Sequence, residues 1–240
     1  MKEKALIKGI LFDFDGTLAN TIDLIVATFE HTCETALGFK PARQTIIDTI
    51  GLPLADALEL LSGIHEPERI LELRQIYGAF NAANHDTMIK PIPGVEELLQ
   101  QLKQRGIKLA VVTSKKGYML ERGMQCLGMP PYIDVTVSVL DTERGKPAPD
   151  PMLLACKRLG LAPGECLCVG DSPFDIQSGN AAGCVTVAVE YTQLDWQSLL
   201  EQGKPSYTIA QPLDLLPLLD ELADSALSHA CDKDKENLFF

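Results

Sequence analysis

Short apolar segments alternate with helical patterns along most of this chain, and this alternation limits the folds that the chain can adopt. Amphipathic helices are predicted over residues 94–105 and 150–159, where leucines recur on one face. Near-continuous apolar strands separated by helices are typical of a parallel sheet that is buried on both faces. The sequence therefore predicts a doubly wound α/β fold with mostly parallel strands. The predicted strands cover residues 7–13, 109–112, 135–139, 166–169, 184–189 and 207–209.

Residues 19–89 break this alternation, because they show helical periodicity but no convincing strand. The sequence Pro91-Ile92-Pro93-Gly94 then marks a boundary. We therefore predict an inserted, all-helical second domain that acts as a lid over the loop before it. Helices that merely pad the main domain are the alternative. The predicted domains are a Rossmann-like core (1–18 and 91–222), a helical cap (19–90) and a polar, disordered tail (223–240).

Two carboxylates end the first predicted strand, in the sequence Asp13-Phe14-Asp15-Gly16-Thr17-Leu18. Residues two apart on extended backbone point the same way, so both carboxylates face one small volume. Like charges held this close need a cation or a shared proton. One carboxylate could attack a phosphorus atom to form an aspartyl phosphate, and the other could move a proton. A polar strand end that turns into a loop is the simpler alternative.

Further polar residues follow other predicted strands at the same edge of the sheet, where ligands bind in open α/β folds. Thr113 and Ser114 end the second predicted strand, and Asp171 and Asp175 follow the fourth. Lys146 stands in a Pro-rich loop before that fourth strand. Each has a simpler interpretation. The hydroxyls and Asp171 could cap the helices that follow, and Lys146 could be a solvated surface lysine.

Taken together, these residues are the set that phosphoryl transfer with Mg²⁺ requires: an in-line nucleophile, cations on the phosphoryl oxygens and a metal site of oxygens. Mg²⁺ takes few carboxylates and keeps several waters. Asp13, Asp171 and Asp175 could supply those carboxylates, and a backbone carbonyl near Asp15 could supply another oxygen. The predicted phosphate-binding residues are Thr113, Ser114 and Lys146.

The charge and the cysteine usage argue against several classes of protein. The formal net charge of −12 argues against a nucleic-acid surface, which would need clustered Lys and Arg. The apolar stretches are far below the roughly 20 residues that span a bilayer, and no signal-peptide cleavage site follows the first residues. The 7 cysteines include no Cys-x-x-Cys pair, so a disulfide framework is not expected. We therefore expect a cytoplasmic monomer or homodimer with no nucleic-acid or membrane partner.

Four segments match, in order, the motifs of a known family: residues 13–18 (Asp-Phe-Asp-Gly-Thr-Leu), 111–114 (Val-Val-Thr-Ser), 146–151 (Lys-Pro-Ala-Pro-Asp-Pro) and 170–175 (Gly-Asp-Ser-Pro-Phe-Asp). On these motifs the chain resembles the haloacid dehalogenase-like superfamily of hydrolases. The first and fourth motifs are specific, whereas the second alone is weak. The helical insert stands where that family carries its helical cap. Within the family, the chain is most similar to the branch of phosphoglycolate phosphatases and pyrophosphatases.

The resemblance implies a role for each candidate residue. Asp13 is then the nucleophile and a metal ligand through its side chain. Asp15 is the general acid and base, and a metal ligand through its main-chain carbonyl. An acid at this second position also implies phosphatase or mutase chemistry, because dehalogenases lack one there. Phosphate binding falls to Thr113 and Lys146, and metal binding to Asp171, with Asp175 as a ligand or an outer partner.

We therefore predict a Mg²⁺-dependent phosphatase that acts through an aspartyl phosphate on a small phosphorylated metabolite, such as a phosphoglycolate- or sugar-phosphate-like monoester. A sugar phosphomutase similar to β-phosphoglucomutase is the nearest alternative. A non-catalytic phosphate-binding regulatory protein on the same fold is another. Release of phosphate with and without Mg²⁺ separates enzyme from binder, and isomerisation of a sugar 1-phosphate identifies a mutase. The motif residues do not identify the substrate, because substrate specificity is expected to come from the cap.

Overall fold

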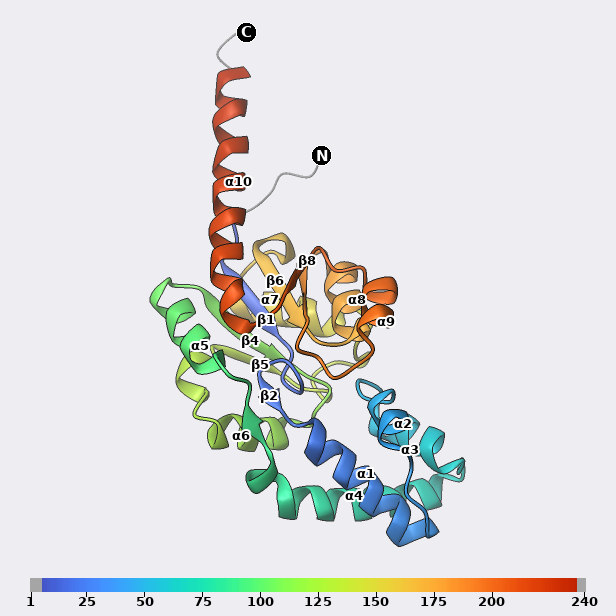
Figure 1. Ribbon diagram of the computed structural model, residues 1–240. Helices are drawn as coiled ribbons and strands as arrows, with labels where there is room; N and C mark the ends of the chain where they lie inside the picture. Colours follow the sequence, from blue (N-terminus) through green and yellow to red (C-terminus); the bar gives the residue numbers. More distant parts are fainter. Residues whose placement is uncertain (1–5, 237–240) are drawn as a thin grey trace.

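A six-stranded parallel sheet forms the centre of the protein in the computed structural model, which describes residues 6–236 (Figure 1). Neighbouring strands run parallel in the order β5-β4-β1-β6-β7-β8. This confirms the predicted α/β sheet, and each predicted strand is present, all but the last with slightly different ends. The strands are β1 (Gly9–Phe12), β4 (Lys108–Val112), β5 (Val135–Val137), β6 (Cys166–Gly170), β7 (Val185–Val189) and β8 (Tyr207–Ile209).

The register of the sheet brings three strand ends to one level. Phe12, at the end of β1, lies opposite Val111 of β4 on one side and Val169 of β6 on the other. The N–H of Asp13 continues this ladder by donating to the carbonyl of Val169 at 2.9 Å. The residues that follow β1, β4 and β6 therefore face the same space beyond the carboxyl edge of the sheet.

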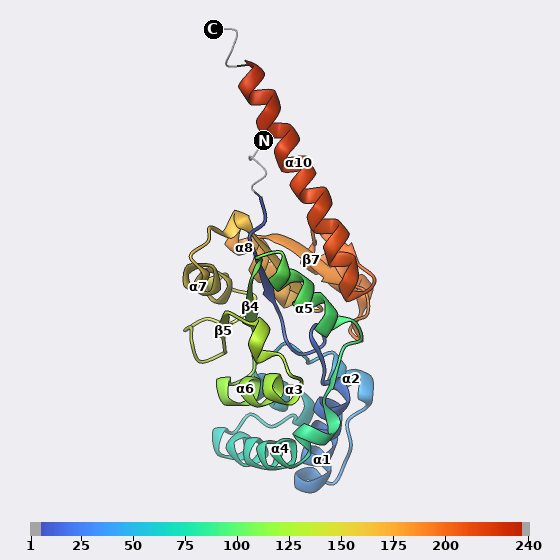
Figure 2. The ribbon, with the colours of Figure 1, turned by 90° about the vertical axis from the view of Figure 1, so that its left-hand side faces the viewer.

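Helices cover both faces of the sheet, because each buries an apolar stripe against it. The helix α5 (Val95–Gln104) and the first half of α10 (Leu215–Glu236) pack on one face. The helix α7 (Asp150–Leu159) packs on the other face. Figure 2 shows α5 and α10 on one side of the strands and α7 on the opposite side. The core also contains α6 (Gly117–Cys126), α8 (Pro173–Ala182), α9 (Trp196–Ser198) and single turns at Pro130–Tyr132, Pro163–Glu165, Leu199–Gly203 and Pro212–Asp214.

The insert has its own apolar centre, separate from the sheet. Its helices pack Phe29, Leu58 and Leu73 together with other buried aliphatic side chains. A pair of antiparallel two-residue strands, β2 (Ala19–Asn20) and β3 (Lys90–Pro91), joins the insert to the core. The sequence analysis missed these strands, because two residues are too few to show strand periodicity. The helices of the insert are α1 (Ile22–Leu37), α2 (Arg43–Ile47), α3 (Leu54–Ser62) and α4 (Pro67–Met88).

The last helix runs through residues 223–236, a part of the segment that the sequence analysis predicted to be disordered. The backbone stays helical to Glu236 in α10, and this helix projects from the body (Figures 1 and 2). Alanine and leucine, two of the strongest helix formers, recur between Leu215 and Ala230 and outweigh the polar composition of the segment. Residues 1–5, which the sequence analysis placed in the core, and 237–240, the end of the predicted tail, lie outside the described residues.

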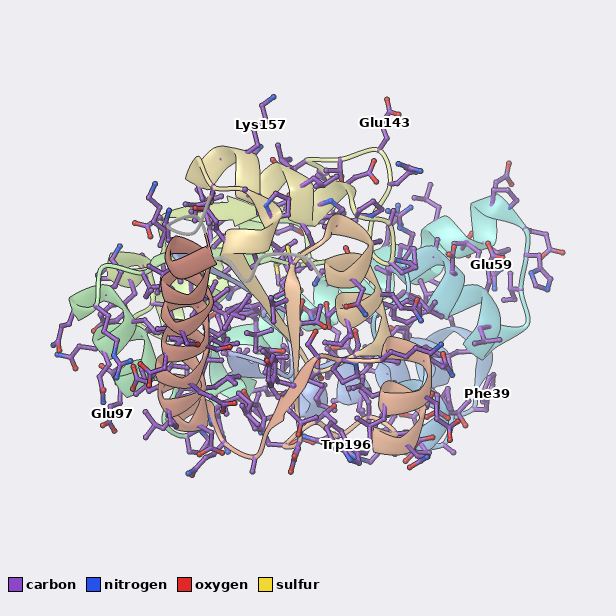
Figure 3. All side chains as sticks on the ribbon, turned by 90° about the horizontal axis from the view of Figure 1, so that it is seen from above. Phe39, Glu59, Glu97, Glu143, Lys157 and Trp196 are labelled. Atoms are coloured by element: carbon purple, nitrogen blue, oxygen red, sulfur yellow. The ribbon has the colours of Figure 1, made fainter. Side chains whose placement is uncertain are left out.

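Charged side chains stand at the rim of the molecule. The labelled Glu59, Glu97, Glu143 and Lys157 project outward in Figure 3. No helix within residues 6–236 is both long enough and apolar enough to cross a membrane. The cysteines whose side chains the structure describes are free thiols, of which Cys126 is exposed and the rest are buried.

Candidate active site

Three carboxylates converge where β1 and β6 end. Asp13 directly follows β1, Asp171 directly follows β6, and Asp175 lies in the first turn of α8. One oxygen of each lies within 4.8 Å of the others, and all three residues are buried. The structure thus brings together the acids that the strand-end argument selected. We call these three residues the acid cluster.

Lys146 lies inside the acid cluster, so its interpretation as a solvated surface lysine is wrong. Its Nζ is 2.7 Å from Oδ1 of Asp13 and 2.5 Å from Oδ1 of Asp175, and its side chain is 3% exposed. Burial alone would lower the pKa of Lys146, but the carboxylates of Asp13 and Asp175 raise it. Lys146 therefore supplies a permanent positive charge beside Asp13.

The acid cluster holds more negative charge than Lys146 neutralises. Burial raises the pKa of Asp13 to about 7; Lys146 opposes this rise, and Asp175 and Asp15 add to it. Burial and the charge of Asp13 likewise raise the pKa of Asp171 above its ordinary value. Buried oxygen ligands with uncompensated negative charge are what a hard divalent cation requires. The cluster therefore fits a metal ion of this class.

The first turn of α8 fixes Asp175 against Lys146. Ser172 is the N-cap of α8, and its Oγ accepts a hydrogen bond from the N–H of Asp175 at 3.3 Å. In return, Oδ2 of Asp175 accepts from the N–H and the hydroxyl of Ser172 at 3.1 and 2.6 Å, which completes a capping box. The interpretation of Asp171 as the cap of this helix is therefore wrong, and its carboxylate belongs to the acid cluster.

Two neighbours fix the carboxylate of Asp171. The backbone of Gly16 has φ of 88°, and a Cβ there would collide with this carboxylate, so the position requires glycine. On another side, the hydroxyl of Thr192 donates to Oδ2 of Asp171 at 3.2 Å. The sequence analysis missed Thr192, because it follows β7 in a stretch that carries no recognisable motif.

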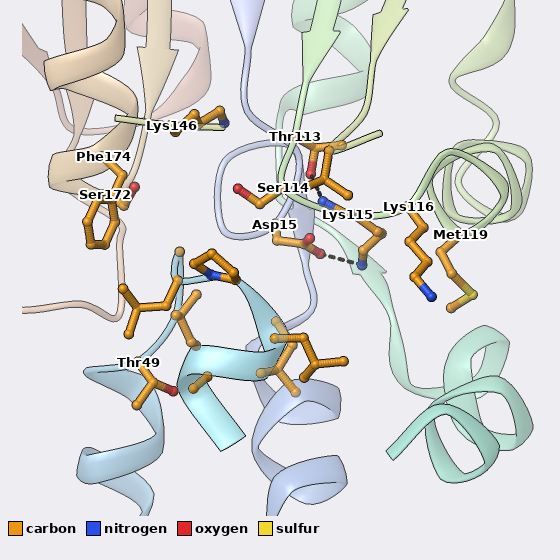
Figure 4. Close-up of a pocket in the computed structure, with 18 of the residues that line it drawn as sticks. Asp15, Thr49, Thr113, Ser114, Lys115, Lys116, Met119, Lys146, Ser172 and Phe174 are labelled. Atoms are coloured by element: carbon orange, nitrogen blue, oxygen red, sulfur yellow. Dashed lines mark hydrogen bonds and ion pairs between the residues drawn. The ribbon is translucent and has the colours of Figure 1, made fainter. Parts of the chain in front are cut away.

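Asp15 forms an ion pair with Lys115, whose Nζ lies 2.7 Å from Oδ1 of the carboxylate (Figure 4). The same Nζ lies 5.5 Å from the centre of the Phe14 ring, a distance that suits a cation–π contact. The sequence analysis assigned Lys115 no role. The available signal was its place directly after the two hydroxyl residues at the end of β4.

Thr113 is buried and Ser114 is exposed, and both line the cavity between the core and the insert. Oγ1 of Thr113 accepts a hydrogen bond from the N–H of Lys115 at 3.1 Å, which leaves its proton free to donate to a ligand. Neither residue caps α6, because the N-cap position is Lys116 and no side chain caps that helix. The capping interpretation is therefore wrong for both hydroxyls.

The acid cluster opens into this cavity, which has a volume of about 450 Å³. Figure 4 shows Lys146, Thr113 and Asp15 on the core side and Thr49 of the insert across from them. The insert lines the cavity mainly with apolar side chains and contributes Arg74 as its cation. Arg74 forms no ion pair with the side chains that the structure describes. The cavity therefore has a core wall that carries the charged and hydroxyl side chains and a mostly apolar insert wall.

Comparison with known proteins identifies the family. The family model of the haloacid dehalogenase-like hydrolases matches residues 10–189, which is most of the chain. The chain belongs to this family. The matched range includes every residue of the acid cluster, together with Lys146, Thr113 and the whole helical insert.

Proteins named pyrophosphatase PpaX are similar to this hydrolase along nearly their whole length. That of Halalkalibacterium halodurans is 37% identical over 213 residues, which are 89% of this chain and 97% of the relative. That of Bacillus cereus is 36% identical over 216 residues, which are 90% of this chain and 98% of the relative. A solved structure from Haemophilus somnus, named a predicted phosphoglycolate phosphatase, has a TM-score of 0.82 at 25% identity and covers 89% of this chain and 98% of that one. This chain is therefore a hydrolase of the phosphatase branch of the family.

Proposed function

We propose that this hydrolase cleaves a small phosphorylated compound in a Mg²⁺-dependent reaction, through an aspartyl phosphate at Asp13. The observation that carries the proposal is the position of the Asp13 carboxylate. It lies 2.7 Å from Lys146 and lines the cavity, with the second acid Asp15 two residues away. A carboxylate held beside a fixed cation, with a proton-carrying group nearby, is suited to covalent phosphoryl transfer.

The chemistry divides between Asp13 and Asp15. An oxygen of Asp13 attacks the phosphorus atom, and the bond from phosphorus to the leaving oxygen breaks as Asp15 gives that oxygen a proton. Asp15 then takes a proton from the water that attacks the aspartyl phosphate, which releases phosphate and restores Asp13. The ion pair with Lys115 holds the Asp15 carboxylate in place at the cavity. Lys146 and the hydroxyls of Thr113 and Ser114 hold the phosphoryl oxygens throughout.

The side chains of Asp13 and Asp171 and the main-chain carbonyl of Asp15 would hold Mg²⁺. When bound, Mg²⁺ would partly neutralise the negative charge on the phosphoryl oxygens. Both oxygens of Asp175 already have partners, in Lys146 and Ser172. We therefore assign Asp175 to holding Lys146 in place rather than to the metal.

Asp171→Asn is expected to raise the Tm of the metal-free protein and to remove most of its stabilisation by Mg²⁺. The substitution removes a like charge from the acid cluster and also removes a ligand. At 100 times Kd, Mg²⁺ should stabilise the wild type by about 2.7 kcal/mol, or roughly 5–11 °C in Tm for a chain of this size. Thermal melts in EDTA and in Mg²⁺ measure both effects, with the exposed Asp56→Asn as the matched control. Equal Mg²⁺ shifts in wild type and Asp171→Asn would contradict the assignment.

Inorganic pyrophosphate is the first substrate to test, because relatives 36–37% identical to this chain are named pyrophosphatases. Besides Lys146, the cavity is lined by Lys115, Lys116 and Arg74, which suit an anionic leaving group. Phosphoglycolate and glucose 1-phosphate are the comparison substrates. Mg²⁺-dependent phosphate release from at least one of them supports the proposal. Isomerisation of glucose 1-phosphate would instead identify a mutase, and tight phosphate binding without any turnover would identify a regulatory binder.

Arg74→Ala is expected to reduce kcat/KM for pyrophosphate about tenfold or more, the effect of losing a charged hydrogen bond, and to affect p-nitrophenyl phosphate far less. Arg74 lines the cavity from the insert, whereas the transferred phosphoryl group is assigned to the core wall, so we expect Arg74 to contact the leaving group. Lys146→Ala should instead reduce all substrates alike, since each presents the same phosphoryl group. Arg69→Ala, on the same helix but paired with Glu72, is the control. This division of roles would be contradicted if Arg74→Ala lowered kcat/KM equally for all substrates and Lys146→Ala changed the order in which the enzyme prefers them.

A further inference from the structure

Residues 191–194, the linking segment, connect the catalytic loops of the core to the insert. The segment lies between β7 and α9, in the orange loop on the side of the core that faces the insert in Figure 1. On the core side, the hydroxyl of Tyr191 donates to the carbonyl of Thr17 at 3.1 Å, in the loop that carries the catalytic acids. The next residue, Thr192, donates to Oδ2 of Asp171 at 3.2 Å. Two consecutive residues thus hold two parts of the active site.

The following two residues of the linking segment contact the insert. The side-chain oxygen of Gln193 accepts a hydrogen bond from Arg43 of α2 at 3.0 Å. Arg43 in turn pairs with Asp23 of α1 at 2.8 Å, so this contact reaches two helices of the insert. Leu194 packs against the buried apolar cluster of the insert. The side chain of Leu194 therefore leaves the core and joins the packing of the other domain.

A hydrogen-bond relay joins these two halves of the linking segment. The N–H of Leu194 donates to Oγ1 of Thr192 at 3.0 Å, and the hydroxyl of Thr192 donates to Asp171 at 3.2 Å. A hydroxyl has one proton, and the bond from Leu194 occupies one of its lone pairs. The position of the Leu194 backbone therefore sets the direction in which Thr192 presents its proton. A displacement of Leu194 with the insert would turn that proton away from Asp171.

We propose that the linking segment couples the position of the insert to the orientation of Asp171, with Thr192 as the positioning residue. The coupling rests on the proposed function, because it gives Asp171 the role of a metal ligand. Contact between the insert and Leu194 then orients the Asp171 carboxylate through Thr192 and raises its affinity for Mg²⁺. By reciprocity, Mg²⁺ favours the arrangement in which the insert contacts the core. Asp171 is therefore oriented to bind Mg²⁺ when the insert covers the site.

The metal side of the relay is tested by titrating Mg²⁺ into the purified protein by calorimetry. Thr192→Val keeps the shape of the side chain but removes the hydroxyl, and it is expected to weaken Mg²⁺ binding about 10- to 100-fold, the usual cost of losing a partner that orients a metal ligand. Thr192→Ser keeps the hydroxyl and should restore most of the affinity. If Thr192 served only the stability of the fold, Thr192→Val would lower the Tm and leave the Mg²⁺ Kd unchanged.

The insert side is tested with Leu194→Ala, which touches neither Asp171 nor the metal. It is expected to weaken Mg²⁺ binding roughly 2- to 30-fold, the range of mutations that lie between coupled sites. Leu153→Ala, at an exposed leucine on α7 that is outside the apolar cluster of the insert, is the control and should leave the Mg²⁺ Kd unchanged. In the double variant Thr192→Val/Leu194→Ala, the loss should equal that of Thr192→Val alone, because both substitutions break one relay.

Separate outcomes contradict the coupling and the proposed function. An unchanged Mg²⁺ Kd in Leu194→Ala would overturn the coupling, and so would a double variant in which the two losses of Mg²⁺ affinity multiply. In either case the proposed function stands if the wild type binds Mg²⁺ and releases phosphate. A wild type that binds no Mg²⁺ would overturn the metal role of Asp171, and the coupling with it. Each variant is first checked by its thermal melt in EDTA, so that loss of the fold is separated from loss of the site. If Leu194→Ala fails this check, Gln193→Ala replaces it and the same results are expected.

Discussion

Replacing Asp13 with asparagine is expected to abolish steady-state phosphate release and leave the protein folded. Only an ionised carboxylate at the end of β1 can form the acyl phosphate, and the amide of asparagine is a far weaker nucleophile. The loss should be on the order of 10⁴- to 10⁶-fold in kcat, comparable with removal of a covalent nucleophile elsewhere. The fold should survive, because the substitution relieves charge repulsion in the acid cluster and Lys146 keeps its contact with Asp175.

The measurement is continuous phosphate release from pyrophosphate and from p-nitrophenyl phosphate, together with a thermal melt. Asp56→Asn makes the same chemical change at an exposed position of the insert and should have wild-type activity. Activity of Asp13→Asn within about tenfold of the wild type, where covalent catalysis predicts at least about 10⁴-fold loss, would remove Asp13 from the mechanism.

Replacing Asp15 with alanine is expected to slow hydrolysis of a substrate with a poor leaving group more than that of one with a good leaving group. A general acid matters most when the departing oxygen needs a proton, and it contributes roughly 10²- to 10⁴-fold. An alkyl phosphate should therefore lose most of that factor. For p-nitrophenyl phosphate, kcat/KM should change far less, because this leaving group departs without a proton and kcat/KM does not report the later hydrolysis of the aspartyl phosphate.

The comparison is kcat/KM for the two substrates, in Asp15→Ala and in Lys115→Ala. Lys115→Ala removes the ion-pair partner of Asp15 but keeps the acid itself, so it is the control for disturbance of the loop. Suppose that Asp15→Ala lowers kcat/KM by the same factor for both substrates, and that Lys115→Ala lowers it by that factor too. Asp15 would then act through its ion pair and not as the acid.

The sheet was predictable from the sequence because its strands are buried on both faces. In a chain with alternating helices, near-continuous apolar runs such as 109–112 and 166–169 are typical of the inner strands of a parallel sheet. The strands β2 and β3 were missed because each has only two residues. The described part of the predicted disordered tail is helical: its polar composition favoured disorder, whereas its alanines and leucines favour helix. Local propensity decided that segment.

The acid cluster was predictable because one topological rule places it. Residues that follow parallel strands meet at the carboxyl edge, so Asp13, Asp171 and Thr113 could be grouped without knowledge of side-chain contacts. Pairings between groups could not be obtained in this way. The contact of Lys146 with Asp175 depends on the path of the loop before β6, and that of Thr192 with Asp171 depends on a turn after β7. Neither of these pairings has a sequence signature.

The central claim is that Asp13 carries the phosphoryl group, and chemical trapping tests it most directly. Sodium borohydride reduces an aspartyl phosphate to homoserine, so the enzyme is mixed with substrate and Mg²⁺, quenched in borohydride, digested and analysed by mass spectrometry. We predict homoserine at residue 13, present with substrate and Mg²⁺ and absent when either is omitted. A protein that turns over substrate under the same conditions with Asp13 unmodified, or with the modification at another carboxylate, would contradict the account.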